Sequence, residues 1–238
     1  MKTRTLVVTM ALVVGVGFSG PASADTISVS ALDSGWYDEG GLNHPDNLNY
    51  AVGYSGEPNP DARDFFVFDL GSVTGTVIGA TLRAYNPSKA EGYGGDGFVS
   101  TSATETLRLF EVSTAIADLR AGVTNPIAIY QDLGTGTLFG ERTVSVADNG
   151  TFVDTVLNSN ALAAINAALG NEWAIGGALL RGDPSAYLFA YSYQKDFVPQ
   201  HIAPALILET SAVPLPPAVL LLASGLAAFG FMRQRRLR

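Results

Sequence analysis

The chain has 238 residues, of which 47% are hydrophobic and 15% are charged, and its formal net charge is −8. Acidity is concentrated in residues 25–212, where 8 Lys and Arg face 22 Asp and Glu, a formal charge of −14. Binding to a phosphate backbone needs clustered Lys and Arg, so this balance argues against a nucleic-acid partner. The chain contains no cysteine, which excludes disulfides and thiolate metal sites.

Residues 1–24 have the features of a secretory signal peptide. A positively charged start is followed by an apolar segment, residues 6–18, which is too short to span a bilayer comfortably. Ala22 and Ala24 then provide small side chains at the −3 and −1 positions of a cleavage site. We therefore expect export and cleavage after Ala24, with an uncleaved anchor as the alternative.

Residues 25–212 contain short β-type runs separated by Gly, Pro, Asn and Asp. The expected strands are 26–32, 48–54, 64–70, 77–86, 105–112, 140–146, 151–157, 172–180, 186–193 and 204–209. Two segments, 114–122 and 159–170, have helical spacing and end at glycine. This pattern predicts one all-β domain, a β-sandwich of jelly-roll type with one or two short helices, and a β-barrel is the alternative.

Alternation within the strand expected at 77–86 predicts the orientation of its side chains. Successive residues of a strand point to opposite faces of the sheet. The side chains that share one face are Ile78, Ala80, Leu82 and Ala84. We therefore expect these four apolar side chains on the same side of the sheet.

A long polar and aromatic segment, residues 35–54, precedes the apolar run at 64–70. Flat aromatic side chains suit the apolar faces of sugar rings, and neighbouring polar groups can bind the hydroxyls. The candidate glycan-binding residues are Trp36, Tyr37, Tyr50 and Tyr54. In the alternative interpretation, Trp36 and Tyr50 pack as lids of the hydrophobic core.

A glycine-rich loop, residues 90–98, carries the candidate calcium ligands Glu91 and Asp96. Carboxylate and carbonyl oxygens are the ligands that calcium prefers. The spacing of an EF-hand loop is absent, so a plain glycine-rich connection is the alternative. No other cofactor is expected.

The sequence contains few groups arranged for catalysis. It has no G-x-S-x-G, P-loop or H-E-x-x-H motif. The only histidines, His44 and His201, lie beside prolines and are expected in surface turns. Acidic pairs such as Asp61 and Asp64 resemble the carboxylates of glycosidases, but so many carboxylates produce such pairs by chance. We therefore expect a protein that is not an enzyme.

Residues 213–238 form a C-terminal segment in three parts. A proline motif is followed by an uncharged apolar run, 218–232, and then by arginines. From the start of the motif to the end of the run there are 20 residues, about the span of a bilayer core, and the arginines should stay cytoplasmic. The motif consists of Val213, Pro214, Leu215, Pro216 and Pro217, and the membrane-stop residues are Arg233, Arg235, Arg236 and Arg238.

The motif, apolar helix and arginines together resemble the PEP-CTERM class of sorting signals, in its VPLPA-type variant. Pro217 stands where that variant has alanine. The resemblance covers about the last 26 residues. It implies processing near the proline motif by an exosortase-type enzyme, in Gram-negative bacteria that make exopolysaccharide. A plain membrane anchor that is never cut is the alternative.

The middle of the chain carries a second resemblance. The segments RDFFVFDL, GTVIGATLRAYNP and PALILET are similar to strands of extracellular jelly-roll modules that resemble carbohydrate-binding modules. The matched residues, 63–87 and 203–210, are core positions, so no functional residue is carried over. The resemblance implies a jelly roll and glycan binding.

These features predict an exported protein that is held in the inner membrane by its C-terminal helix and then reaches the cell surface or extracellular matrix. Its expected role is non-catalytic and includes glycan binding, with an exosortase-type enzyme and a polysaccharide as partners. A structural or adhesive matrix protein without a small ligand is one alternative. A glycan-active enzyme is the other.

Overall fold

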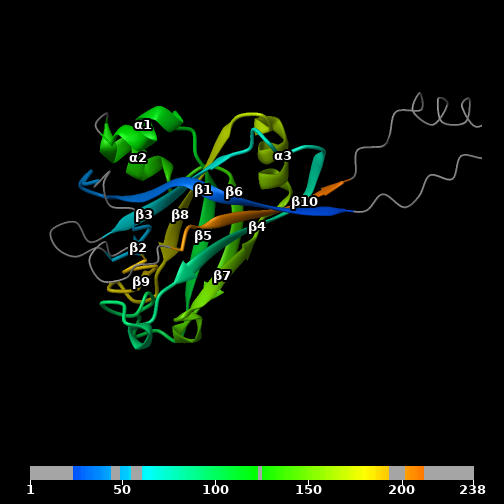
Figure 1. Cartoon of the computed structure of the whole chain (residues 1–238). Coiled ribbons are helices and arrows are strands. Elements are labelled where there is room, and N and C mark those ends of the chain that lie inside the picture. Colours follow the sequence, from blue (N-terminus) through cyan, green and yellow to red (C-terminus); the bar gives the residue numbers. More distant parts are fainter. Residues whose placement is uncertain (1–23, 44–48, 55–60, 123–124, 193–201, 212–238) are drawn as a thin grey trace, which may run out of the picture. The chain divides into compact units, whose positions relative to one another are not determined.

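Ten strands form one continuous sheet in the computed structural model (Figure 1). The structure describes residues 24–43, 49–54, 61–122, 125–192 and 202–211, which belong to the unit Ala24–Ser211. Ala22, both histidines, the proline motif, the apolar run and the membrane-stop arginines lie outside the described residues. Among the residues described, no helix is long and apolar enough to cross a bilayer.

The strands are β1 (Asp25–Asp38), β2 (Val52–Gly53), β3 (Ala62–Asp69), β4 (Thr76–Asn86), β5 (Glu105–Glu111), β6 (Leu138–Val144), β7 (Thr151–Val156), β8 (Glu172–Leu180), β9 (Tyr187–Leu188) and β10 (Ala205–Ser211). The helices are α1 (Ile116–Ala121), α2 (Pro126–Asp132) and α3 (Ser159–Ala168). The predicted all-β class is therefore confirmed, as are the helices expected at 114–122 and 159–170. The short helix α2, which begins at a proline, was not predicted.

Strand β1 joins the two halves of the sheet, whose strand order is β6-β5-β8-β3-β1-β10-β4-β7. Its first half, up to Ser30, pairs with β10, and its second half, from Ala31, pairs with β3, with a register shift between Ala31 and Asp33. Such a bulge bends a strand and increases its twist, which lets one strand serve both halves. Because β1 and β10 are antiparallel, Asp25 lies directly opposite Thr210.

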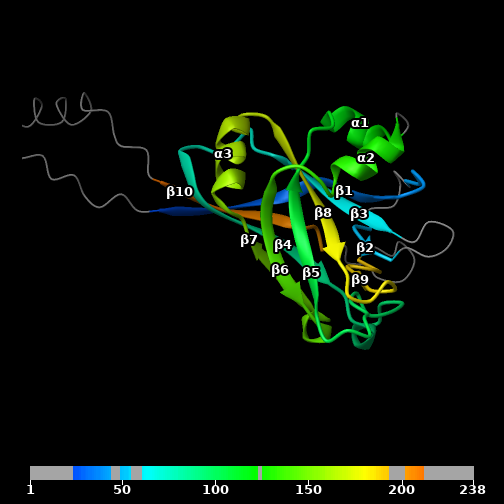
Figure 2. The same cartoon turned by 180° about the vertical axis from the view of Figure 1, so that it is seen from behind.

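Hydrogen bonds from Asn158 and Arg142 connect the two end strands of this order, β6 and β7, so the sheet is nearly closed (Figure 2). Asn158, just after β7, donates its backbone N–H to the carbonyl of Phe139 at 2.7 Å and its side-chain amide to that of Leu138 at 2.7 Å. Farther along, the Nη1 of Arg142 donates to the carbonyl of Asp154 at 3.1 Å. Backbone carbonyls at the edges of β6 and β7 thus accept hydrogen bonds that a neighbouring strand would otherwise provide.

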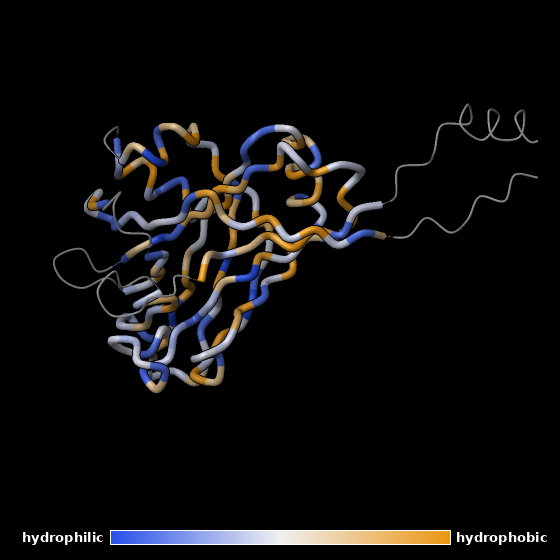
Figure 3. The backbone as a smooth tube through the Cα atoms, viewed as in Figure 1, coloured by the Kyte–Doolittle hydropathy of each residue, from blue (hydrophilic) through white to orange (hydrophobic). Residues whose placement is uncertain are grey.

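Strand β3 is buried on both faces. Phe66 and Phe68 point into the main core enclosed by the sheet, whereas Phe65 and Val67 pack in a second cluster with residues of α1 and α2. A strand covered on both sides reads as a continuous apolar run, which explains the segment FFVF. In Figure 3 the tube changes repeatedly between hydrophobic and hydrophilic colours along the other strands, as expected where one face meets solvent.

The prediction that Ile78 lies on the same face of the sheet as Ala80 and Leu82 is wrong. The register between β4 and β10 shifts at this point, because Gly79 pairs with Glu209 but Val77 pairs with Thr210. The extra residue is a bulge, and it places Val77 in the core while Ile78 is 52% exposed. Beyond the bulge, Ala80, Leu82 and Ala84 are buried on one face, as expected.

Candidate functional site

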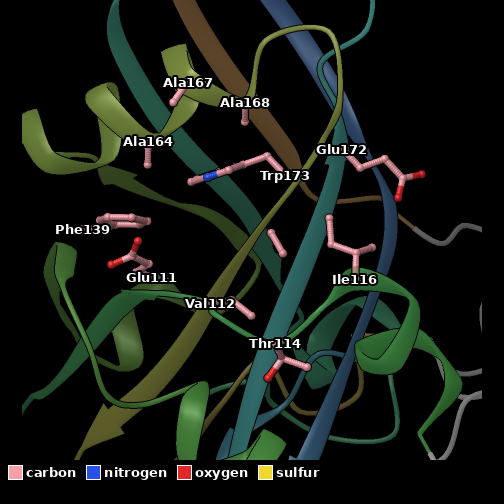
Figure 4. A pocket seen from close by; sticks show the side chains of 11 residues that line it. Glu111, Val112, Thr114, Ile116, Phe139, Ala164, Ala167, Ala168, Glu172 and Trp173 are labelled. Carbon is pink, nitrogen blue, oxygen red and sulfur yellow. The ribbon is translucent and has the colours of Figure 1, made fainter.

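A pocket of about 360 Å³ opens between α3 and the segment that follows β5 (Figure 4). Its walls come from the end of β5, the approach to α1, the start of β6, helix α3 and the start of β8. The lining residues are Glu111, Val112, Thr114, Ile116, Phe139, Ala164, Ala167, Ala168, Glu172, Trp173 and Ala174. The volume lies at the lower end of the range for small-molecule sites, which is roughly 300–1,000 Å³.

An aromatic stack supports the pocket. The indole of Trp173 is nearly parallel to the rings of Phe139 and Phe68, with centroid distances of 6.1 Å and 6.3 Å. Both phenylalanines are core residues, and Trp173 itself is only 7% exposed. Packing therefore fixes the orientation of the indole before any ligand binds, which lowers the entropy cost of binding.

Helix α3 forms one wall of the pocket with small side chains. Its N-cap residue, Asn158, accepts hydrogen bonds from the backbone of Asn160 and Ala161, and the buried Ile165 holds the helix on the core. The residues that face the pocket are Ala164, Ala167 and Ala168. Larger side chains at these positions would occupy the space, so the alanines keep the pocket open.

Two carboxylates lie on opposite sides of Trp173 in Figure 4. Glu111 accepts a hydrogen bond from the hydroxyl of Thr137 at 2.7 Å. Glu172 forms an ion pair with Arg120 at 3.2 Å. The pocket thus combines an aromatic and aliphatic surface with a few polar groups at its edge, the usual composition of a site for a small organic ligand.

The segment between β5 and α1 is held by Asp132 at the end of α2. Its carboxylate accepts hydrogen bonds from the backbone N–H groups and hydroxyls of Ser113 and Thr114, at 2.6–2.9 Å. Burial alone would raise the pKa of Asp132, but these hydrogen bonds outweigh it and lower the pKa. An ionised Asp132 therefore positions the part of the pocket wall that contains Thr114.

Two of the four aromatic residues predicted to bind glycans are core residues, so that part of the prediction needs correction. Tyr37 is 0% exposed, donates its hydroxyl to the carbonyl of Leu119 and packs near Phe65. Tyr50 is also 0% exposed and donates its hydroxyl to the carbonyl of Tyr85 at 3.0 Å. Neither ring presents a face on which a sugar could stack. For Tyr50 the alternative interpretation, a core lid, describes the structure.

Trp36 and Tyr54 are half-buried. Trp36 belongs to β1, which continues to Asp38, so the polar and aromatic segment begins as a strand rather than a loop. Tyr54 follows β2 and donates its backbone N–H to the carbonyl of Ala186. Neither residue lines the pocket described above.

The candidate calcium ligands Glu91 and Asp96 lie around Ser88 and already accept hydrogen bonds there. Glu91 accepts from the hydroxyl of Tyr85 at 2.6 Å and the N–H of Ser88 at 3.3 Å. Asp96 accepts from the N–H of Lys89 at 2.9 Å and the hydroxyl of Ser88 at 3.3 Å. Within the described ranges, no group of three or more His, Asp or Glu side chains is arranged to hold a metal ion.

The two residues of the acidic pair considered for glycosidase chemistry lie in different surroundings. Asp61 accepts from the hydroxyl of Tyr130 and forms an ion pair with Arg181 at 2.7 Å. Asp64 is 0% exposed in the core, out of reach of a polysaccharide. This pair therefore does not form a catalytic site at the surface.

The pocket residues were not identified as a site from the sequence. Trp173 stands in an apolar strand segment, as core residues do, and most of its surface is buried. Glu111 and Glu172 stand at ends of apolar strands, and the alanines of α3 recur at helical spacing. Such signals are common in ordinary strands and helices, and only the packing of α3 against β6 and β8 brings them together. No protein-family model matches the chain, and comparison with curated proteins finds no match either.

Proposed function

We propose that this chain is an exported, non-catalytic protein of the cell surface or exopolysaccharide matrix that binds a glycan in the pocket beside α3. The observation that carries the proposal is the pocket itself, to which the fixed indole of Trp173 contributes its small exposed part and Glu111, Thr114 and Glu172 contribute hydrogen-bonding groups. Flat apolar surface suits the face of a sugar ring, and polar groups at the edge suit its hydroxyls.

We further propose that the sheet is a jelly-roll-like β-sandwich. The sharing of β1 between the two halves, and the core enclosed by them, support this assignment. The three C-terminal features and the N-terminal leader support export, sorting by an exosortase-type enzyme and membrane anchoring. The pairing of Asp25 with Thr210 is compatible with this proposal, because it places the first and last strands of the described domain side by side.

Isothermal titration of the purified chain against neutral oligosaccharides of several linkages tests the binding function. We expect at least one to bind, and Ala167→Arg to abolish that binding by filling the pocket. Ala163→Arg is the matched control: residue 163 is exposed on the same helix but outside the pocket. Absence of binding to every glycan, or equal binding by both variants, would contradict the proposal.

Mass spectrometry of the secreted form tests the sorting assignment. The proposal predicts a mature protein that begins at Asp25 and lacks the residues beyond about 213. Substituting Pro214 and Pro216 by alanine should leave the tail attached. A cytosolic chain with both ends intact would contradict export.

The two glutamates in one pocket favour a glycan-active enzyme as the second candidate. Incubation of the chain with polysaccharide and analysis of reducing ends would detect hydrolysis. Activity that disappears in Glu111→Gln or Glu172→Gln, but not in Glu141→Gln, would replace binding by catalysis as the function.

A further inference from the structure

We propose that the pocket selects glycans that carry free, protonated amino groups, such as partly deacetylated amino-sugar polymers. This inference rests on the proposed function and names the chemical class of its ligand. The juxtaposition that carries it is one pocket lined by Trp173 and by two glutamates, Glu111 and Glu172, with no basic side chain in its lining.

Glu111 supplies negative charge that the described protein leaves uncompensated. Its side chain is exposed, its hydrogen-bond donor is the neutral hydroxyl of Thr137, and no cation of the described segments lies within ion-pair distance of it. A carboxylate in this position attracts an ammonium group on a bound sugar and repels the carboxylate of a uronic acid.

The negative charge of Glu172 is only partly compensated by a neighbouring positive charge. Arg120 contacts its carboxylate at 3.2 Å, but the Nε of the same guanidinium lies 3.3 Å from Asp33. One positive charge therefore serves two carboxylates. The immediate surroundings of the pocket carry a net negative charge even with Arg120 included.

No other arginine of the described residues is free to offset this charge. Each arginine pairs with a carboxylate: Arg63 and Arg181 with Asp61, Arg83 with Asp154, Arg108 with Glu141, Arg120 with Asp33 and Glu172, and Arg142 with Asp148. The formal charge of −14 over residues 25–212 adds a long-range field of the same sign. Such a field raises the local concentration of cationic ligands.

The expected preference is modest and depends on salt. An ammonium–carboxylate pair at a partly exposed site usually contributes a few-fold in affinity. We therefore expect a glucosamine oligomer to bind several-fold more tightly than its N-acetylated counterpart at low ionic strength. The ratio should approach one in concentrated salt, because salt screens exposed charges.

Fluorescence titration provides the test, because the chain has two tryptophans and Trp36→Phe leaves Trp173 as the sole indole reporter. The probes are chitosan hexamer, N-acetylated chitohexaose, cellohexaose and an oligouronate, at mildly acidic pH where sugar amines are protonated. Glu111→Gln should lower the ratio of chitosan to chitohexaose affinity. Glu141→Gln is the control, since Glu141 is 55% exposed on β6 outside the pocket.

The outcomes separate the two proposals. Tighter binding of chitosan that depends on Glu111 supports the inference. Equal affinity for the neutral and cationic oligomers, or preference for the oligouronate, overturns it while glycan binding stands. Failure of all four probes, together with failure of a broader neutral panel, overturns the proposed function as well.

Discussion

The carboxyl group of Asp64 lies against the Cα of Gly177, its paired residue on β8, and a Cβ at position 177 would overlap Oδ1 of Asp64. Asp64 is fully buried, and neither carboxyl oxygen has a hydrogen-bond partner among the described residues. Desolvation by burial raises the pKa of Asp64 well above its ordinary value. The core thus contains an acid that favours its neutral form.

Ionisation of Asp64 should lower the free energy of unfolding as pH rises. Asp64→Asn is expected to remove this decrease. The folded state holds the Asp64 proton more tightly than the unfolded chain, whose aspartates titrate near pH 4. Stability from this group is therefore complete below about pH 4 and is lost as pH rises toward the folded pKa, by up to about 1.4 kcal/mol per unit. Urea unfolding at several pH values above 5 should show a flatter profile for the variant. Asp118→Asn, the same substitution at an exposed position, is the matched control.

Gly177→Ala should destabilise the fold by about 1–3 kcal/mol, because the added methyl group overpacks the contact with Asp64. Adding Asp64→Ala should relieve part of this cost. Urea denaturation of the wild type, both single variants and the double variant measures the coupling. If the two effects simply add, the contact between these residues is not the reason for the glycine.

Asn158→Ala should destabilise the fold by about 1–2 kcal/mol. The substitution removes the side-chain hydrogen bond to Leu138 across the gap between β6 and β7, and also the cap of α3. Thermal or urea unfolding provides the measurement. Asn160→Ala, an exposed position in the first turn of the same helix, should change stability much less.

Glu105→Gln should make unfolding less sensitive to acid. Burial alone would raise the pKa of Glu105, but hydrogen bonds from Ser100, Gly182 and Asp183 outweigh it and lower the pKa. The resulting stability is present above the unfolded pKa, near 4.3, and is lost as pH falls through the folded pKa. We expect the variant to be about 1–3 kcal/mol less stable at neutral pH, with a smaller decline at acidic pH. An unchanged acid profile would contradict this role.

Local patterns were sufficient to predict most of the strands, because period-two alternation and turn residues act over a few positions. The run at Phe65–Phe68 is an example, although its burial on both faces depends on α1 and α2. Ile78 shows the limit. A bulge shifts the pattern by one residue, and that shift is set by pairing with the distant strand β10.

The candidate site was harder to predict, for a related reason. Tyr37 and Tyr50 look like binding residues in a polar segment, yet they are covered by parts of the chain far away in sequence. The pocket is likewise made by residues from 111 to 174 that meet only after the sheet has formed. Neither the burial of these tyrosines nor the pocket can be recognised from a local sequence pattern.

The position of β10 has a mechanical consequence for an anchored protein. β10 is an interior strand, paired over six residues with β1 and over seven with β4. If the chain is tethered through the residues after Ser211, a pull along β10 loads both ladders in shear, so that many hydrogen bonds share the force. A tether attached to an outer strand would instead peel its bonds one at a time. With such a tether, the domain is suited to stay folded under tension.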